Sequence, residues 1–81
     1  HNFFRRKLKK LNKKEQIWIE NRLRIFTQDL NNPILSNHAL HGKYLGCRSI
    51  SISGNLRAIY KMQDNNIALF IDIDNHANLY K

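Results

Sequence analysis

The sequence predicts an α+β fold in which a two-helix antiparallel hairpin packs on a small, curved antiparallel β-sheet. Two periodicities predict it: apolar residues recur at helical spacing up to residue 28, and at every second position from residue 43 onward. A chain of 81 residues buries only about 60–65% of its unfolded surface, so we expect one domain, residues 1–81, with a thin core. One sheet face needs a cover, and the two helices are the cover available.

The first predicted helix covers residues 1–11. Phe4, Leu8 and Leu11 fall on one face of it, and basic residues occupy the remaining faces. Such a pattern indicates a helix that buries one stripe and presents positive charge to its surroundings.

The second predicted helix covers residues 13–28. Asn12 is the expected N-cap, because Glu15 follows three positions later, as a capping box requires. A connection this short favours an antiparallel hairpin. The expected apolar stripe consists of Ile19, Leu23, Phe26 and Leu30.

A three-stranded meander is predicted for residues 43–74, after a loop over residues 29–40 rich in turn residues. In the first strand Ile50 and Ile52 alternate with serines, as in a half-buried strand. The second strand covers residues 56–62 and the third residues 67–73, with turns between them. The third strand is expected to present on one face Ile67, Leu69, Ile71 and Ile73.

The charge is strongly positive: fourteen Lys and Arg oppose six Asp and Glu, a formal net charge of +8. Half of these bases lie in residues 1–14. A domain this basic favours a polyanion or an acidic protein as its partner, since neutralising phosphates releases counterions; a merely soluble basic face is the alternative. The lone Cys47 favours a reducing compartment, and no apolar run is long enough for a membrane span, so we expect a cytoplasmic protein without membrane contact.

Polar residues suited to chemistry gather on the meander and after it. No glycine-rich phosphate loop is present, and His38 with His41 is weak evidence for zinc, so we expect no metal and no other cofactor. If the sheet curves, its strand ends and the segment over residues 75–81 can close on one groove. The candidates for that groove are His38, His41, Lys43, Arg48, Arg57, Lys61, His76 and Tyr80.

The order of three motifs resembles the RelE/ParE toxin superfamily, and is closest to its RelE- and YafQ-like mRNA interferases. The motifs are H-x-L-x-G-x-x-x-G-x-R-S at residues 38–49, L-R-x-I-Y at residues 56–60 and I-x-x-H-x-x-L-Y at residues 73–80. The preceding basic helices fit the family as well, so the resemblance covers nearly the whole chain. The family usually opens with a strand paired into the sheet, whereas only HNFF precedes the basic helix here.

The resemblance implies the toxin of a type II toxin–antitoxin system, with a cognate antitoxin as partner. It also implies an endoribonuclease that cuts mRNA at the ribosomal A site without a metal. Arg57 would then steady the scissile phosphate, His76 would serve in acid–base chemistry, and Tyr80 is the aromatic residue four places later. His38 matches the histidine of the H-x-L-x-G motif used by YafQ-like members. We expect RNA contacts from Lys43, Arg48, His41 and Lys61.

The residue types suit that reaction on physical grounds. Metal-free RNA cleavage needs a base for the 2′-hydroxyl, an acid for the leaving 5′-oxygen and positive charge for the phosphorane. Histidine titrates near neutrality, and the planar arginine fork matches phosphate oxygens. Tyr80 could stack on a base or bind a phosphate through its hydroxyl.

Other readings of the same residues stay open. Tyr80 could be an apolar plug, Arg57 a cross-strand partner of Asp72, and His38 and His41 ordinary loop residues. For the whole chain, one alternative is a ParE-like toxin that binds DNA gyrase without cutting RNA. Another is a member that only binds its antitoxin, because the YafQ-like branch has a second His and an Asp at the positions of Ser51 and Asn55.

Overall fold

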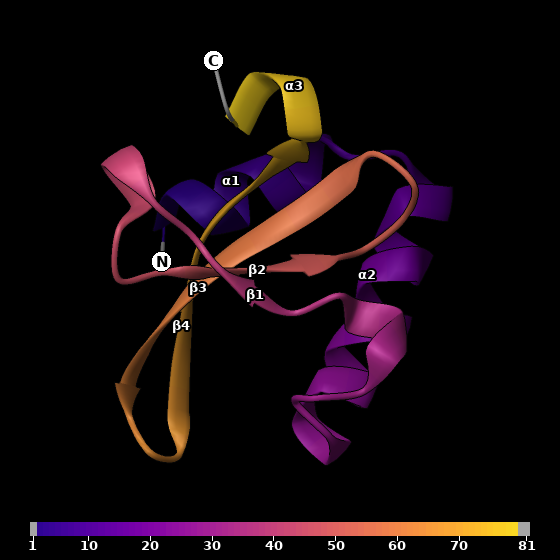
Figure 1. The fold of residues 1–81 in the computed structure, drawn as a ribbon. Coiled ribbons are helices and arrows are strands. Elements are labelled where there is room, and N and C mark those ends of the chain that lie inside the picture. Colours follow the sequence, from indigo (N-terminus) through magenta and orange to yellow (C-terminus); the bar gives the residue numbers. More distant parts are fainter. Residues whose placement is uncertain (1, 80–81) are drawn as a thin grey trace.

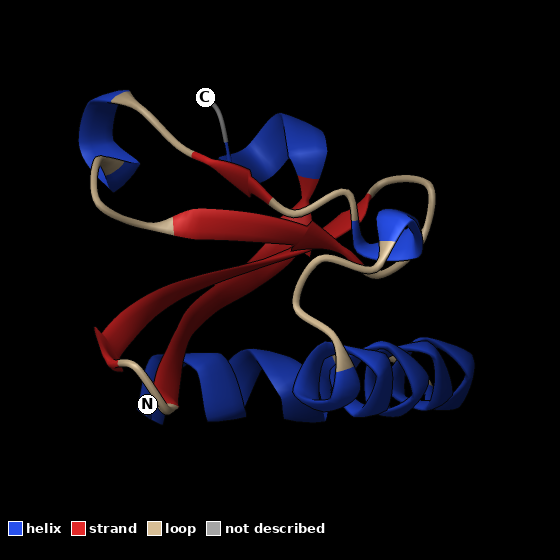
Figure 2. Cartoon of the chain, turned by 60° about the horizontal axis from the view of Figure 1, so that its bottom comes forward, coloured by secondary structure: helices blue, strands red, loops and turns tan. Residues whose placement is uncertain are grey.

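The computed structural model describes residues 2–79 and shows two helices on one face of a four-stranded antiparallel sheet (Figures 1 and 2). A short third helix and the loop over residues 40–47 lie over the opposite face. The elements are α1 (Asn2–Lys10), α2 (Lys13–Gln28), β1 (His38–Ala39), β2 (Arg48–Ser51), β3 (Leu56–Asp64), β4 (Ile67–Asn75) and α3 (His76–Leu79), with 3-10 turns η1 (Pro33–Leu35) and η2 (Gly42–Tyr44). The predicted α+β class is confirmed.

The second helix covers residues 13–28, as the sequence predicts, and a complete N-terminal cap fixes its start. The Asn12 side chain accepts a hydrogen bond from the Glu15 backbone N–H at 2.8 Å, and the Glu15 carboxylate accepts one from the Asn12 N–H at 3.1 Å. Together these bonds satisfy two backbone donors that a helix start leaves open. Leu30 lies beyond the end of α2 and is 40% exposed, so the predicted apolar stripe stops at Phe26.

The two helices are joined by the short turn that the sequence predicts and lie on the same face of the sheet. They leave the turn at Leu11 and Asn12 in different directions and diverge across the same sheet face (Figures 1 and 2). The Gln16 amide sets this turn, since its Nε2 donates to the carbonyls of Leu8 and Leu11 at 3.4 and 2.9 Å.

The sheet order is β1-β2-β3-β4, with every neighbouring pair antiparallel. The predicted meander corresponds to β2, β3 and β4. Strand β1 is an addition, since residues 29–40 were expected to form a loop. A strand of two residues is too short to show an alternating pattern of apolar residues. In the structure His38 pairs with Ser49, which makes it part of the sheet.

A bulge in β4 corrects the predicted apolar face of that strand. Ile59 pairs with Asp72 and the next residue, Tyr60, pairs with Phe70, so Ile71 is an extra residue in the ladder. Phe70 and Ile73 consequently pack on the helix side, whereas Ile71 packs on the opposite side.

Both sheet faces carry an apolar core. Among the described residues, ten are buried in the core under the helices, including Phe4, Phe26, Tyr60 and Ile73. The smaller core on the opposite face contains Leu40, Cys47, Ile59 and Leu79. Ser49 is also fully buried, so β2 is not the half-exposed strand that its alternating serines predict.

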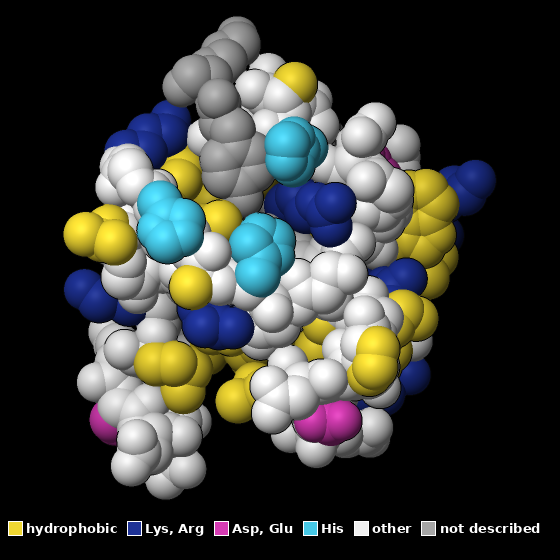
Figure 3. Space-filling model, viewed as in Figure 1, with side chains coloured by type: hydrophobic (Ala, Val, Ile, Leu, Met, Phe, Trp, Pro, Cys, Tyr) yellow, Lys and Arg dark blue, Asp and Glu magenta, His cyan; other side chains and the backbone are white. Residues whose placement is uncertain are grey.

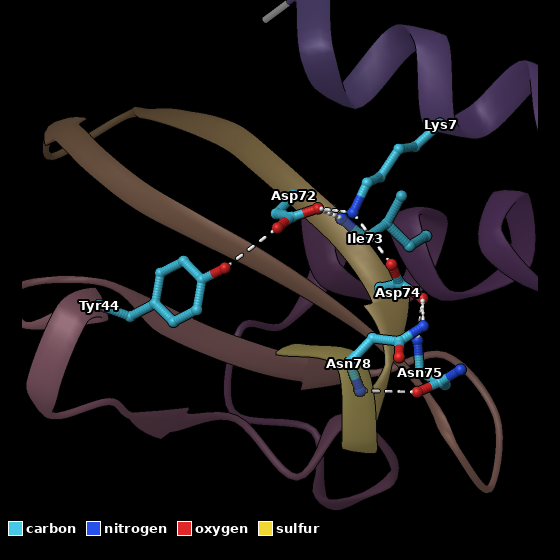
Figure 4. A network of polar contacts seen from close by, with 7 residues as sticks. All are labelled: Lys7, Tyr44, Asp72, Ile73, Asp74, Asn75 and Asn78. Atoms are coloured by element: carbon cyan, nitrogen blue, oxygen red, sulfur yellow. Dashed lines mark hydrogen bonds and ion pairs between the residues drawn. The ribbon is translucent and has the colours of Figure 1, made fainter. Parts of the chain in front are cut away.

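Lys7 joins α1 to the edge strand β4 (Figure 4). Its Nζ lies 2.8 Å from Asp72 Oδ1 and 3.0 Å from Asp74 Oδ2. On the other side of the strand, the Tyr44 hydroxyl donates to Asp72 Oδ2 at 3.0 Å. One carboxylate is thus held from both faces of the sheet.

The pKa values of this cluster shift in opposite directions. Burial alone would lower the pKa of Lys7, but hydrogen bonds to Asp72 and Asp74 and their charges outweigh it and raise this pKa. Burial alone would raise the pKa of Asp74, but hydrogen bonds from Asn78, Lys7 and the Asn75 backbone outweigh it and lower this pKa. Lys7 therefore stabilises the fold at any pH below its ordinary value, 10.5, and loses this contribution as pH rises through its folded value. The contribution of Asp74 is present above its ordinary value, 3.8, and is lost as pH falls through its folded value.

Replacing Lys7 with methionine should lower the free energy of unfolding at pH 7 by about 1–3 kcal/mol, because it leaves two neighbouring carboxylates without their cation. Urea unfolding of both proteins measures this loss, and the difference between them should shrink below pH 3.8 as Asp74 is protonated. Lys9→Met, on the exposed side of α1, should change stability by less than about 0.5 kcal/mol. Equal losses in the two variants would show that the cluster contributes nothing specific.

Candidate functional site

Three histidines line one shallow hollow on the sheet face opposite α1 and α2. His38 lies in β1, His41 immediately before η2 and His76 at the start of α3, and together with Ala39 and Leu40 they enclose a space of about 360 Å³. All three histidines are exposed. Figure 3 shows them gathered on one face with Lys or Arg side chains beside them. The sequence predicted that His38, His41 and His76 converge, and the structure brings them together.

Backbone contacts on both sides hold His76 in place. Its N–H donates to the Asn55 carbonyl at 2.8 Å, which ties α3 to the β2–β3 turn. Asn75 caps the helix, since its Oδ1 accepts a hydrogen bond from the Asn78 N–H at 2.8 Å (Figure 4). Leu79 is only 2% exposed and packs in the smaller core. A four-residue helix is thereby fixed at both ends.

One hydrogen bond assigns the protons of His38. Its Nδ1 lies 2.8 Å from the Ser36 carbonyl oxygen, which can only accept a hydrogen bond. In the neutral ring Nδ1 therefore carries the hydrogen and Nε2 carries the lone pair. This tautomer leaves Nε2 as the proton acceptor in a residue at the rim of the hollow.

Arg57 lies on the same sheet face as the histidines. It alternates along β3 with Leu56 and Ala58 of the helix-side core, and it shares its face with Ile59 of the smaller core. Asp74 is its cross-strand neighbour, but the carboxylate of Asp74 is 3.0 Å from Lys7 instead. The Arg57 guanidinium makes no hydrogen bond or ion pair with any other residue in the described range 2–79. The alternative of an ion pair with Asp72 is wrong, because Asp72 faces Ile59 in the register.

The lysine of η2 stands beside this face. Lys43 Nζ lies 5.2 Å from the centroid of the Tyr44 ring, a cation–π geometry, and the Tyr44 hydroxyl is fixed by Asp72. The short loop is thus anchored to β4 through Tyr44, which the sequence reading did not single out. The sequence gives no signal for the hydrogen bond between Tyr44 and Asp72, because the two residues are 28 positions apart.

Two predicted phosphate ligands do not line the hollow of the three histidines: Arg48 lines a neighbouring hollow with His41, and Lys61 lies farther along β3. Arg48 lies opposite Tyr60 in the register and so projects toward the helix side, where its Nε donates to Asn37 Oδ1 at 2.8 Å. Asn37 in turn donates to the Tyr60 hydroxyl at 2.7 Å, which makes Arg48 part of a structural network. Lys61 shares the face of Arg57 but stands four residues along β3, about 13 Å away at 3.3 Å per residue.

Tyr80, the fourth predicted catalytic residue, lies outside the described residues 2–79. Within that range no three His, Cys, Asp or Glu side chains are grouped to hold a metal ion, and no helix has the length and apolar content to cross a bilayer.

Neither a protein-family model nor a curated protein matches the sequence. Two solved structures from Helicobacter pylori share the fold. A copper-bound mutant toxin matches with a TM-score of 0.62 and 20% identity, over 90% of this chain and 80% of that chain. A conserved hypothetical protein solved in solution matches with a TM-score of 0.63 and 17% identity, over 99% of this chain and 93% of that chain. Likeness at such identities shows a common fold.

Ser49 offers a test of the structure beneath the hollow. Its Oγ is buried and makes no hydrogen bond with any described residue, next to His38 in the register. Ser49→Ala should leave the melting temperature unchanged or raise it, because it removes a buried hydroxyl without a partner. Ser51→Ala, which removes a hydroxyl that donates to the Ser53 carbonyl at 3.2 Å, should cost about 0.5–1 kcal/mol. A larger loss at Ser49 than at Ser51 in thermal unfolding would contradict this arrangement.

Proposed function

We propose that this protein is the toxin of a type II toxin–antitoxin system and cuts mRNA at the ribosomal A site as a metal-independent endoribonuclease of the RelE/YafQ type. The observation that carries the proposal is the hollow of three histidines on the same sheet face as a guanidinium with no ion-pair partner among the described residues. The fold, shared with a solved Helicobacter pylori toxin, agrees with the resemblance of the motifs.

The first role is that of general base, which the tautomer of His38 suits. Its Nε2 lone pair takes the proton of the 2′-hydroxyl, whose oxygen attacks the neighbouring phosphorus. As the new P–O bond forms, the bond between phosphorus and the 5′-oxygen breaks. The products are a 2′,3′-cyclic phosphate and a free 5′-hydroxyl.

The remaining roles are proton donation and charge stabilisation. His76, in its protonated form, gives the leaving 5′-oxygen its proton. Arg57 faces the negative charge that accumulates on the phosphorane oxygens, where a planar guanidinium can make two parallel hydrogen bonds. Because Lys7 already neutralises Asp74, the charge of Arg57 is available to the phosphate. His41 and Lys43 lie where they can hold flanking phosphates.

His76→Ala should lower the single-turnover rate of mRNA cleavage on ribosomes by about 10²–10⁴-fold, because it removes the proton donor. Arg57→Ala should cost about 10²–10³-fold, because it withdraws charge from the phosphorane. Lys61→Ala, about 13 Å along the same strand, should reduce the rate by less than about threefold.

All three variants should retain the melting temperature of the parent protein, since their side chains lie outside both cores. Primer extension on mRNA from expressing cells distinguishes the alternatives. Cuts within translated codons support the nuclease, whereas intact mRNA with inhibited gyrase supercoiling would replace it with the ParE-like binder. Intact mRNA with normal supercoiling would leave a protein that only binds its antitoxin.

A further inference from the structure

The loop over residues 40–47 carries His41 and Lys43 beyond the edge of the sheet, where η2 stands clear of the strands (Figure 1). Its two ends are fixed: the Leu40 N–H donates to the Cys47 carbonyl at 3.0 Å, and both side chains pack in the smaller core. His41 and Lys43, between these ends, are exposed. Where these two side chains lie therefore depends on what holds the middle of the loop.

Tyr44 holds the middle of this loop against β4. Its ring packs at the margin of the smaller core, and its hydroxyl donates to Asp72 Oδ2 at 3.0 Å (Figure 4). Its backbone N–H donates to the His41 carbonyl at 3.3 Å, and its carbonyl accepts a hydrogen bond from the Cys47 N–H at 2.9 Å. These bonds join one residue to both halves of the loop, so a shift of the Tyr44 side chain moves the backbone that carries Lys43.

Asp72 can bind partners from both faces because β4 lies at the edge of the sheet. The residue is only 9% exposed, and both of its carboxylate oxygens accept hydrogen bonds. Oδ1 lies 2.8 Å from Lys7 Nζ and accepts from the Ile73 N–H at 2.8 Å, while Oδ2 accepts from Tyr44. Donors from α1, from β4 itself and from the loop thus fix the orientation of one carboxylate.

Lys7 keeps this carboxylate in its orientation. A largely buried carboxylate that loses its cation is costly, and turning toward water lowers that cost. Such a rotation of Asp72 would carry Oδ2 away from the Tyr44 hydroxyl and break the charge-assisted bond that holds the loop. A lysine on the helix side of the sheet thereby acts on a loop on the opposite side.

We propose that Lys7 and Asp72 are positioning residues for the histidine face. Through the Tyr44 hydroxyl they hold the loop over residues 40–47 where His41 and Lys43 bind the phosphates that flank the cleaved one. What the loop binds rests on the function proposed above, whereas the link from α1 to the loop does not. The link predicts that a change at Lys7 is felt across the sheet.

Backbone NMR signals of the full chain test the link without any RNA. Lys7→Met, which keeps the length of the side chain, should shift the amide signals of His41 and Lys43. Tyr44→Phe, which removes only the hydroxyl, should shift the same signals. Lys9→Met removes the same charge from the exposed side of α1 and should leave them unchanged.

An RNA that cannot be cleaved tests the consequence for binding. The affinity of a single-stranded 2′-O-methyl RNA, measured by fluorescence anisotropy, should fall about three- to tenfold in Lys7→Met and in Tyr44→Phe. The dependence of affinity on salt should flatten as phosphate contacts are lost. Lys9→Met should change affinity by less than about threefold. The double variant K7M/Y44F should bind no more weakly than the weaker single variant, because both changes break the same link.

Cleavage kinetics on ribosomes separate positioning from catalysis. Flanking phosphates are held equally in the ground state and the transition state, so Tyr44→Phe should raise KM about three- to tenfold and leave kcat within about twofold. A loss in kcat at unchanged KM would instead assign Tyr44 to the chemical step and contradict its positioning role.

Two further results would overturn the proposal. One is a Lys7→Met protein that is less stable while its His41 and Lys43 signals stay where they are, which would make the ion pair purely structural. The other is full additivity of the two affinity losses in K7M/Y44F, which would show two independent effects. If Lys7→Met shifts the loop signals but the parent protein binds no RNA, the link stands, and the phosphate role of the loop fails together with the proposed nuclease.

Discussion

The structure depends on β3 being buried on both faces. Ile59 and Tyr60 are neighbours on that strand and point to opposite sides, yet neither is more than 1% exposed. Each of these side chains needs an apolar environment, so other parts of the chain must cover both faces of the sheet. The side of Tyr60 is covered by the two helices and by Leu35, and the rings of Phe26 and Phe70 contact the Tyr60 ring. Among the described residues, the side of Ile59 is covered by Leu40, Cys47 and Leu79, with Tyr44 and Ile71 at the margin.

The smaller core, on the side of Ile59, explains why a polar cluster forms on that face. This core is small and contains side chains from the loop before β2, from β3 and from the four-residue helix α3. Much of its boundary therefore lies at the protein surface. The residues next to its members in sequence lie on that rim: His38 and His41 flank Leu40 closely, and His76 begins the helix that Leu79 anchors. The cluster thus follows from the packing of Leu40 and Leu79, and the hydrogen bonds of Asn75 and Asn55 fix its orientation.

Much of the fold could be predicted because its determinants are local. The capping box of Asn12 and Glu15 is visible in the sequence and fixes the start of α2. The convergence of three histidines was predicted from strand order and motif spacing. What could not be predicted depends on contacts between distant residues or on a single extra residue. The bulge at Ile71 reverses the face of half a strand, and Lys7 reaches a carboxylate 67 positions away. The face occupied by Arg48 depends on the register against Tyr60, which composition alone does not reveal.

The distribution of acids accounts for the free positive charge on both faces. Of the six Asp and Glu residues, Asp72 and Asp74 bind Lys7, and Glu15 completes the helix cap. The side chains of two further acids accept backbone hydrogen bonds within turns: Asp29 and Asp64. These five serve the fold, and the sixth, Glu20, lines a hollow together with Arg5 and Lys9. With the exception of Lys7, the fourteen bases therefore have few anions among the described residues, and neither Arg57 on one face nor Arg5 and Lys9 on the other pairs with a described carboxylate.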